Sequence, residues 1–437
     1  MERINPRIAL PCPDLPPELL DKIAKRLPSE IDVCRFRAVC RCWRSSTPPY
    51  KFPTIKLPFP FHPKSNPDPK HSGAYFILTE RVVCRIQLPD SRDPDFWLVK
   101  VEHAENGKAT ILNPVTHRKI QIPAAIEMPK VLNILDSVVS EVCKAYALRY
   151  VNPSKPDERD DYYDYRYANK VISSVNVENG EYVVMVIDFA SRLWRIRSGR
   201  KEWKRIGNYS KPFYDVAIVK GQFHAIDAAG GVWAFNSKFG WKTAASCTSK
   251  NALKRRLVEL YNGELVMVEE MGGPGRGPVS RHFRVKEPVV DVGIYALSKQ
   301  LEKWVDAKAM DGCIIVVGDD CSFSVPTREG LKAARVFYMD RYSFVQDSFL
   351  EDDILRISDD YTCFECDCRG SCNCFHDLEP IATEYLVASD DVGREFEGFY
   401  GHNIGVCDFE TGKTGTALMF PEYANIFWPP PAWLSRT

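Results

Sequence analysis

The sequences VVMVIDFASRLWRIRSGRKEWKRIGN (183–208) and FHAIDAAGGVWAFNSKFGWKTAAS (223–246) share one order of features. Each reads as an apolar strand, a turn of small residues, a strand with a Trp, a polar turn and a second Trp. The first Trp recurs after 39 residues (Trp194 and Trp233), and the second recurs after 38 residues. A repeat of about forty residues made only of strands is typical of a propeller blade.

The same character extends outward from this repeat, because short β-rich runs with turn residues between them begin near residue 74. A third copy, ELVMVEE followed by IYALSKQLEKWVDA, fits if residues 271–288 are an insertion. Residues 152–170 and 359–380 also interrupt the pattern as polar insertions. At about 40–45 residues per blade, residues 73–435 predict a propeller of six to eight blades. A pair of β-sandwiches is the alternative, which the regular Trp spacing disfavours.

Helical periodicity is found at the N-terminal end, in residues 14–46. In LPPELLDKIAKRL the apolar residues recur about every four positions, and the two prolines suit the first turn of a helix. Ser29 is a candidate N-cap, with Asp32 three positions later in the manner of a capping box. We therefore predict two or three short helices, preceded by a tail over residues 1–13.

Eight prolines fall within residues 47–72, between the helices and the β-rich region. Proline lacks the N–H that helices and strand ladders use. The composition predicts an extended, fairly stiff linker with polyproline II character.

Composition narrows the class of protein. The chain has 437 residues, with 58 Lys plus Arg and 58 Asp plus Glu. This balance argues against binding nucleic acid or an anionic membrane through a long-range field. No apolar run is long enough to span a bilayer, and the first residues lack the pattern of a secretory signal. The 15 cysteines are therefore expected as reduced thiols, in the nucleus or the cytoplasm.

The helical segment resembles an F-box, and its sequence DLPPELLDKIAKRLPSEIDVCRFRAVCRCWRSS looks like the plant subgroup in which the box precedes a KIB-type propeller. The resemblance continues in NPVTHRKIQIP (113–123), DVAIVKGQFHAID (215–227) and LVELYNGELVMV (257–268). It extends through EKWV, IIVVGDDCSFSV, VFYMD and GVCDFETGK to the closing segment FPEYANIFWPPPAWL, and so covers most of the chain. One departure is Cys34, at a position that is often Leu in the family.

The resemblance implies a substrate-recognition subunit of a Skp–cullin–F-box ubiquitin ligase. The F-box would bind the Skp-type adaptor and, through it, the cullin and RING subunits, and the propeller would bind a target protein that the sequence does not name. The residues expected to bind the adaptor are Leu15, Pro16, Leu19, Ile23, Leu27, Phe36, Val39, Cys40 and Trp43. A segment this small cannot bury all its apolar residues alone. Periodicity by itself leaves open whether they meet a partner or dock on the propeller as a cap, and the family pattern favours the partner.

One cluster of possible metal ligands lies in the insertion at 359–380. Five cysteines and a histidine fall within fourteen residues: Cys363, Cys366, Cys368, Cys372, Cys374 and His376. They could supply four ligands to zinc. The C-x-C spacings are shorter than those of zinc fingers, and no second ligand pair follows. We expect no metal here and no cofactor elsewhere.

Motifs of catalysis are missing from the sequence. GGPGRG (272–277) lacks the Lys and Ser/Thr that end a P-loop, and we find neither a G-x-S-x-G elbow nor an H-E-x-x-H pair. We therefore predict no catalytic residues and no enzyme. The alternative hypothesis is a propeller enzyme or ligand-binding protein in which the helical head is only a structural cap.

Overall fold

The computed structural model describes a part of the 437-residue chain. The described residues are 15–27, 29–61, 71–87, 96–103, 109–116, 119–120, 138–154, 168–176, 179–188, 190–207, 212–235, 241–243, 252–272, 289, 291–298, 303–307, 312–327, 333–339, 404–420, 423 and 426–427. The insertion predicted at 359–380 and the tail at 1–13 lie outside these residues, as does most of the insertions at 152–170 and 271–288.

Three short helices open the described chain, α1 (Pro17–Ala24), α2 (Glu30–Ala38) and α3 (Arg41–Ser46). Pro17 stands in the first turn of α1, where its missing N–H is not needed. Ser29 caps α2, because its hydroxyl accepts a hydrogen bond from the Asp32 amide at 3.1 Å. The prediction of two or three helices, with Ser29 as an N-cap, is confirmed.

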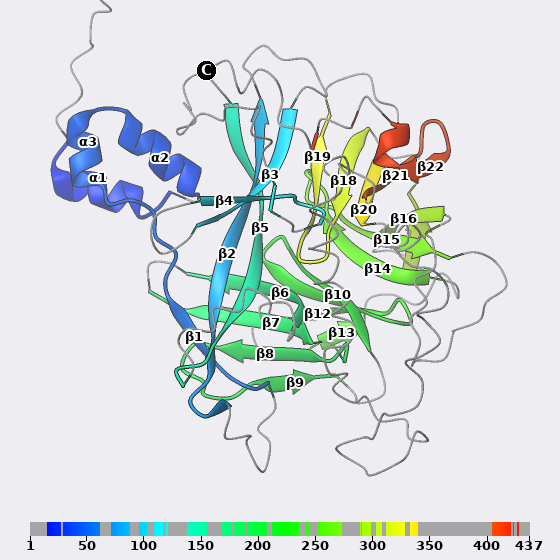
Figure 1. Ribbon diagram of the computed structural model, residues 1–437, viewed down its shortest axis with the longest axis horizontal. Helices are drawn as coiled ribbons and strands as arrows, with labels where there is room; N and C mark the ends of the chain where they lie inside the picture. The colour runs from blue at the N-terminus through cyan, green and yellow to red at the C-terminus, as the bar shows by residue number, and fades with distance from the viewer. Residues whose placement is uncertain are drawn as a thin grey trace, which may run out of the picture.

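The remaining described elements are mostly strands, which form four sheets (Figure 1). The first sheet has the order β4-β3-β2-β5-β6-β7-β8-β9, and β1 pairs with β2 outside this path. Its strands are β1 (Ile55–Pro58), β2 (Tyr75–Gln87), β3 (Phe96–His103), β4 (Ala109–Leu112), β5 (Val138–Val151), β6 (Ala168–Val175), β7 (Tyr182–Asp188), β8 (Leu193–Arg197) and β9 (Lys204–Ile206).

The second and third sheets are antiparallel meanders of four strands each. The second contains β10 (Phe213–Val219), β11 (Gln222–Asp227), β12 (Val232–Phe235) and β13 (Trp241–Thr243). The third contains β14 (Ala252–Glu259), β15 (Leu265–Met271), β16 (Asp291–Ser298) and β17 (Lys303–Asp306). The insertion predicted within the third copy of the repeat falls between β15 and β16, so that copy forms one sheet.

The fourth sheet has the order β19-β18-β20-β21-β22 and includes one parallel pair, β18 with β20. Its strands are β18 (Cys313–Val317), β19 (Ser322–Pro326), β20 (Arg335–Met339), β21 (Ile404–Asp408) and β22 (Lys413–Thr416), and the short 3-10 helix η4 (Ala417–Met419) follows.

One strand of each group lies toward the centre, and these inner strands contact one another in a ring. β10 lies against β6 and β14, β19 lies against β14 and β5, and β5 pairs with β6. The first sheet therefore supplies two groups, which β5 and β6 join. This arrangement of radial, mainly antiparallel groups is that of a propeller.

The described strands make five groups, whereas the length of the repeat predicts six to eight blades. Two groups use far more chain than forty residues. The first contains strands of 13 and 14 residues, β2 and β5, and the last extends from Cys313 to Thr416. Residues 340–403, inside the last group, lie outside the described residues.

The predicted linker contains a strand that its prolines did not suggest. β1 pairs antiparallel with the first residues of β2, from Ile55 opposite Leu78 to Pro58 opposite Tyr75. Pro58 ends the strand, where its missing N–H costs least, and its carbonyl accepts a hydrogen bond from Trp203 Nε1 at 2.8 Å. Phe61 is buried in the same apolar cluster as Phe76. This part of the linker is thus built into the propeller.

The C-terminal residues close the core between the first and the last group. Phe420, Tyr423, Ile426 and Phe427 are buried in one cluster with side chains of β3, β18 and β20. The Ile426 carbonyl accepts a hydrogen bond from the Leu98 amide at 2.7 Å. Among the described residues, no helix is long and apolar enough to cross a membrane.

Candidate functional site

The helical head leaves three large apolar side chains exposed. Leu19 and Ile23, four positions apart and therefore on one side of α1, are 45 % and 40 % exposed, and Val39 after α2 is 55 % exposed. Only three other large apolar side chains of the described residues are exposed, and they lie in the propeller: Val138, Tyr261 and Met419. Half of this exposed apolar set therefore comes from three short helices.

The other predicted adaptor-binding residues have mixed positions. Pro16 is exposed, and the remaining ones are half-buried: Leu15, Leu27, Phe36, Cys40 and Trp43. The rings of Phe36 and Trp43 contact each other, with centroids 4.3 Å apart. Leu19 and Ile23 on α1 form what we call the exposed helical face, and Val39 is exposed separately after the end of α2.

Another side of the helical head contacts the propeller through α2. Ile31 packs against the apolar cluster that contains Trp97 and Val139. Arg35 donates a hydrogen bond from Nη2 to the Val139 carbonyl on β5. Of the two readings left open by periodicity, docking on the propeller is seen for α2 alone. Leu19 and Ile23 of α1 remain partly exposed, and the reading in which they meet a partner stays a prediction. The docking residues were not predicted, since Arg35 and Val139 are 104 positions apart.

Carboxylates and tyrosines line this contact between head and propeller. Glu80 on β2 accepts hydrogen bonds from Tyr50 at 2.9 Å and Tyr146 at 3.4 Å, and Lys144 Nζ lies 3.3 Å from it. Burial raises the pKa of Glu141, and so do the nearby charges of Glu80, Asp32 and Glu30, although Lys144 opposes them. The contact thus holds a carboxyl group that resists ionisation.

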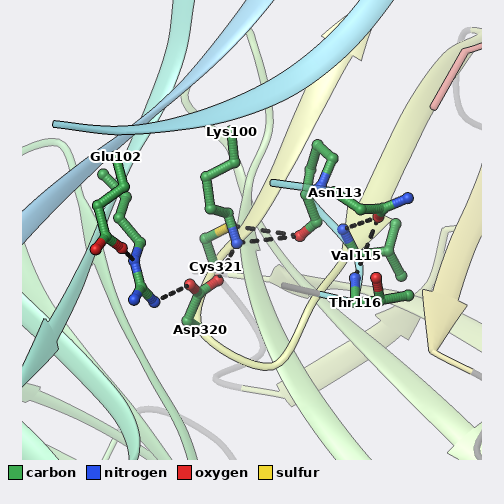
Figure 2. Close-up of polar contacts among 9 residues, drawn as sticks. Lys100, Glu102, Asn113, Val115, Thr116, Asp320 and Cys321 are labelled. Carbon is green, nitrogen blue, oxygen red and sulfur yellow. Dashed lines mark hydrogen bonds and ion pairs between the residues drawn. The ribbon is translucent and has the colours of Figure 1, made fainter. Parts of the chain in front are cut away.

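A second candidate site is a group of charged side chains inside the propeller (Figure 2). Lys100, on β3, is fully buried, and its Nζ lies 2.6 Å from Asp320 Oδ1 and 3.3 Å from the Pro114 carbonyl. Arg81 forms an ion pair with Glu102 and lies 3.6 Å from the other Asp320 oxygen. Burial alone would lower the pKa of Lys100, but the charge of Asp320, its hydrogen bond and the nearby Cys321 together outweigh burial, and the pKa is raised.

This buried group joins two turns that are distant in the sequence. The Asn113 side chain accepts hydrogen bonds from the amides of Val115 at 2.9 Å and Thr116 at 3.2 Å, which shapes one turn. At Gly318, in the other turn, an added Cβ would lie 2.8 Å from the Pro114 carbonyl oxygen. The two backbones therefore approach closely, and Lys100 joins the two turns by binding the Pro114 carbonyl in one and Asp320 in the other. The sequence signal for this group is a Lys within the apolar run FWLVKV.

Further ion pairs join the inner strands of the propeller. Lys170 on β6 lies 2.6 Å from Asp215 on β10, and Arg256 on β14 lies 3.0 Å from Asp319 and 3.8 Å from Asp215. Asp215 also accepts a hydrogen bond from the Leu257 amide at 2.7 Å. Positive and negative groups alternate here, so the interior is suited to holding blades together.

The predicted metal ligands, Cys363 to His376, lie outside the described residues. Within the part of the chain that the structure describes, no group of three His, Cys, Asp or Glu side chains is placed to hold a metal ion.

Comparison with known proteins gives two family matches. Residues 12–48 match the F-box-like family, and residues 75–365 match the KIB1-4 beta-propeller family. The first match covers the helical head, and the second covers two thirds of the chain, within the propeller.

Relatives of similar length are known from Arabidopsis thaliana. The chain is 27 % identical to F-box protein SKIP23 over 442 aligned residues, which cover 96 % of this chain and 95 % of the relative. It is 25 % identical to F-box protein At2g17036, over 97 % of this chain and 94 % of the relative. The helices, the radial strand groups and these matches agree, and the chain belongs to the plant F-box proteins that carry a KIB1-4 β-propeller.

Proposed function

We propose that the chain is the substrate-recognition subunit of a Skp–cullin–F-box type E3 ubiquitin ligase. The observation that carries the proposal is the exposed helical face. Large apolar side chains at helical spacing, left open on a small head, fit the groove of a partner protein. The F-box-like match over the same residues supports a Skp-type adaptor as that partner.

In this function the chain would position the target protein for ubiquitin transfer and would supply no catalytic group of its own. The adaptor would connect the head to the cullin and RING subunits, and the propeller would hold the target close to the ubiquitin-carrying enzyme. Proximity alone can supply a large part of the rate of such a transfer. We place the complex in the nucleus or the cytoplasm, and the eight cysteines of the described residues, all free thiols, support a reducing compartment.

The alternative of an enzyme or a ligand-binding propeller gains no specific support. The buried Lys100 and Arg256, two cations that could hold a ligand, already lie beside the carboxylates Asp320 and Asp319. The contact of α2 with β5 does show that the head caps the propeller on one side. This contact leaves the exposed helical face open and is compatible with adaptor binding.

The test is binding of the full chain to a purified Skp-type adaptor by titration calorimetry. Replacing Leu19 and Ile23 together by Ala should weaken binding about thirtyfold or more, since interface anchors contribute about 2 kcal/mol or more. The matched control replaces Tyr261 and Met419, which are exposed to a similar or greater degree but lie in the propeller. Equal affinity of both variants would overturn the proposal.

The same pair of substitutions offers a way to capture the target. Deleting the whole head would expose the apolar cluster under Ile31 and remove the Arg35 hydrogen bond, and so would disturb the propeller. A chain with Leu19→Ala and Ile23→Ala should bind its target without delivering it to the ligase. Proximity labelling with this variant should therefore enrich proteins that the unchanged chain removes.

A further inference from the structure

The hairpin of β8 and β9 carries a concentration of positive charge. Residues 192–205 include seven Arg or Lys residues and one acidic residue, Glu202. Arg192 is engaged by Asp188 on β7 at 2.6 Å. The others lie on the two strands and their turn: Arg195, Arg197, Arg200, Lys201, Lys204 and Arg205.

The register of the hairpin brings these charges together. Arg195 and Arg197 are two residues apart on β8 and therefore share a face, and Lys204 on β9 is the partner of Arg195. Arg197, Arg200, Lys201 and Lys204 are exposed. Among the described residues, no ion pair joins these four side chains to a carboxylate. Burial and the charge of Arg197 lower the pKa of Arg195, as expected in a cluster of like charges. We call the exposed four the basic hairpin.

Protection of a sheet edge explains only part of this charge. Outer strands often carry a Lys to prevent edge-to-edge pairing. The outer strand β17 has Lys303 together with Asp306, and Lys413 on the outer strand β22 is paired with Asp408. These edges are electrically mixed, whereas the four exposed side chains of the basic hairpin are all positive. The excess of positive charge on the basic hairpin is therefore suited to a negatively charged ligand.

The zero net charge of the chain does not argue against such a ligand. Residues 340–403 contain 16 acidic and four basic residues, which leaves 54 basic and 42 acidic residues in the rest of the chain. The zero net charge is therefore the sum of an acidic segment, residues 340–403, and a positively charged remainder of the chain.

The surroundings of the basic hairpin favour an acidic peptide over a nucleic acid. Single-stranded nucleic acid is held by aromatic rings on which bases stack, but both Trp residues of the hairpin are buried, with Trp194 6 % and Trp203 7 % exposed. A strand of five residues, the length of β8, spans about 17 Å and so matches about five residues of an extended peptide. In Figure 1 the hairpin lies at the bottom of the molecule, far from the helical head.

We propose that the basic hairpin binds an acidic segment of a partner protein, through the guanidinium groups of Arg197 and Arg200 and the ammonium groups of Lys201 and Lys204. This inference rests on the proposed function and adds to it the chemistry of the surface that binds the target protein. Planar guanidinium groups bind carboxylates in a bidentate manner, which favours acidic side chains in a regular arrangement. The binding needs no adaptor, so the two proposals can fail separately.

The experiment uses the full chain and a fluorescein-labelled peptide of ten glutamates, followed by fluorescence anisotropy at low salt. The triple variant Arg197→Glu, Arg200→Glu and Lys201→Glu should bind at least about tenfold more weakly, because reversal replaces attraction by repulsion. The matched control changes exposed lysines elsewhere by the same total charge: Lys51→Glu, Lys303→Glu and Lys413→Glu. The control should keep the affinity of the unchanged chain within about twofold, and added salt should weaken both by screening.

Thermal unfolding of the same variants separates binding from a structural role. The triple variant relieves like-charge repulsion, so its Tm should equal or exceed that of the unchanged chain. Equal loss of binding in the triple variant and the control would reduce the effect to net charge and overturn the proposal. So would no measurable binding of the peptide, or tighter binding of a ten-nucleotide DNA strand that depends on the same three residues.

Discussion

The helical head and the interior of the propeller each reverse the usual placement of side chains, since the head exposes apolar groups and the propeller buries a charge. The head leaves Leu19 and Ile23 about half exposed, in water that a core would exclude. The propeller encloses the ammonium group of Lys100 completely, where a charge is costly. The cost is offset there by Asp320 and the Pro114 carbonyl. The two apolar side chains of the head keep a large exposed area in the part of the chain that the structure describes. The contrast separates an interior whose buried charges have partners from a surface that, in the proposed function, binds the adaptor.

The largest effect should follow from breaking the buried ion pair. Replacing Asp320 by Ala leaves Lys100 and Arg81 without their shared carboxylate, and we expect the free energy of unfolding to fall by about 3–5 kcal/mol. Urea denaturation followed by tryptophan fluorescence measures the change.

Two comparisons make this prediction specific to the buried pair. Replacing Asp21, whose pair with Lys25 lies on the surface of the head at 2.7 Å, should change stability by no more than about 0.5 kcal/mol. A double variant with Lys100→Met and Asp320→Leu should recover most of the loss, because no unpaired ammonium remains. A loss in the double variant as large as that of Asp320→Ala would show that shape rather than charge dominates.

A smaller effect on stability is expected from the two Asp residues that accept hydrogen bonds from the Trp side chains of the repeat. Asp227 accepts hydrogen bonds from Trp233 Nε1 at 3.1 Å and from the Gly231 amide at 2.8 Å, and Asp188 accepts one from Trp194 Nε1 at 2.8 Å. Replacing Asp227 by Ala leaves two buried donors unsatisfied and should cost about 1–3 kcal/mol. Asn179, which accepts a hydrogen bond in an exposed turn, is a control that should cost much less when changed to Ala. A fall in Tm no larger than the control's would contradict this account.

These hairpins also show what the sequence predicts well. The interval of six residues from Asp188 to Trp194 is repeated from Asp227 to Trp233, and both pairs close within a single hairpin. The cap of α2 is local in the same sense, because Ser29 and Asp32 are three residues apart. Interactions between near neighbours leave a period or a motif in the sequence, and the Trp repeat and the Ser29 cap were predicted from these patterns, whereas the role of the two Asp residues was not.

Contacts between distant segments leave no such pattern. Lys100 and Asp320 are 220 positions apart, and neither the Lys nor the Asp predicts the other. The pairing of β1 with β2 was missed for a related reason, since the prolines of the linker conceal a four-residue strand that is stabilised only by its partner. In the candidate site, the helical spacing identified the apolar residues but not which of them the propeller and the helices themselves cover. That division depends on how α2 meets β5.

The smallest expected effect lies at this junction of the two regions. The pKa of Glu141 is raised mainly by burial, then by Glu80 and the carboxylates of α2. The folded state therefore binds a proton on Glu141 more tightly than the unfolded state, and stability falls as the pH rises through and above the ordinary range of a glutamate. Replacing Glu141 by Gln removes this penalty. The Tm at pH 7 should rise slightly, and the gain should shrink as the pH is lowered toward 4, where most of Glu141 carries a proton in the unfolded state as well. Lys144, which favours the charged form, limits the gain. Thermal scans of both chains between pH 4 and pH 8 test the prediction, and a gain that does not depend on pH would show that the side chain acts through packing instead.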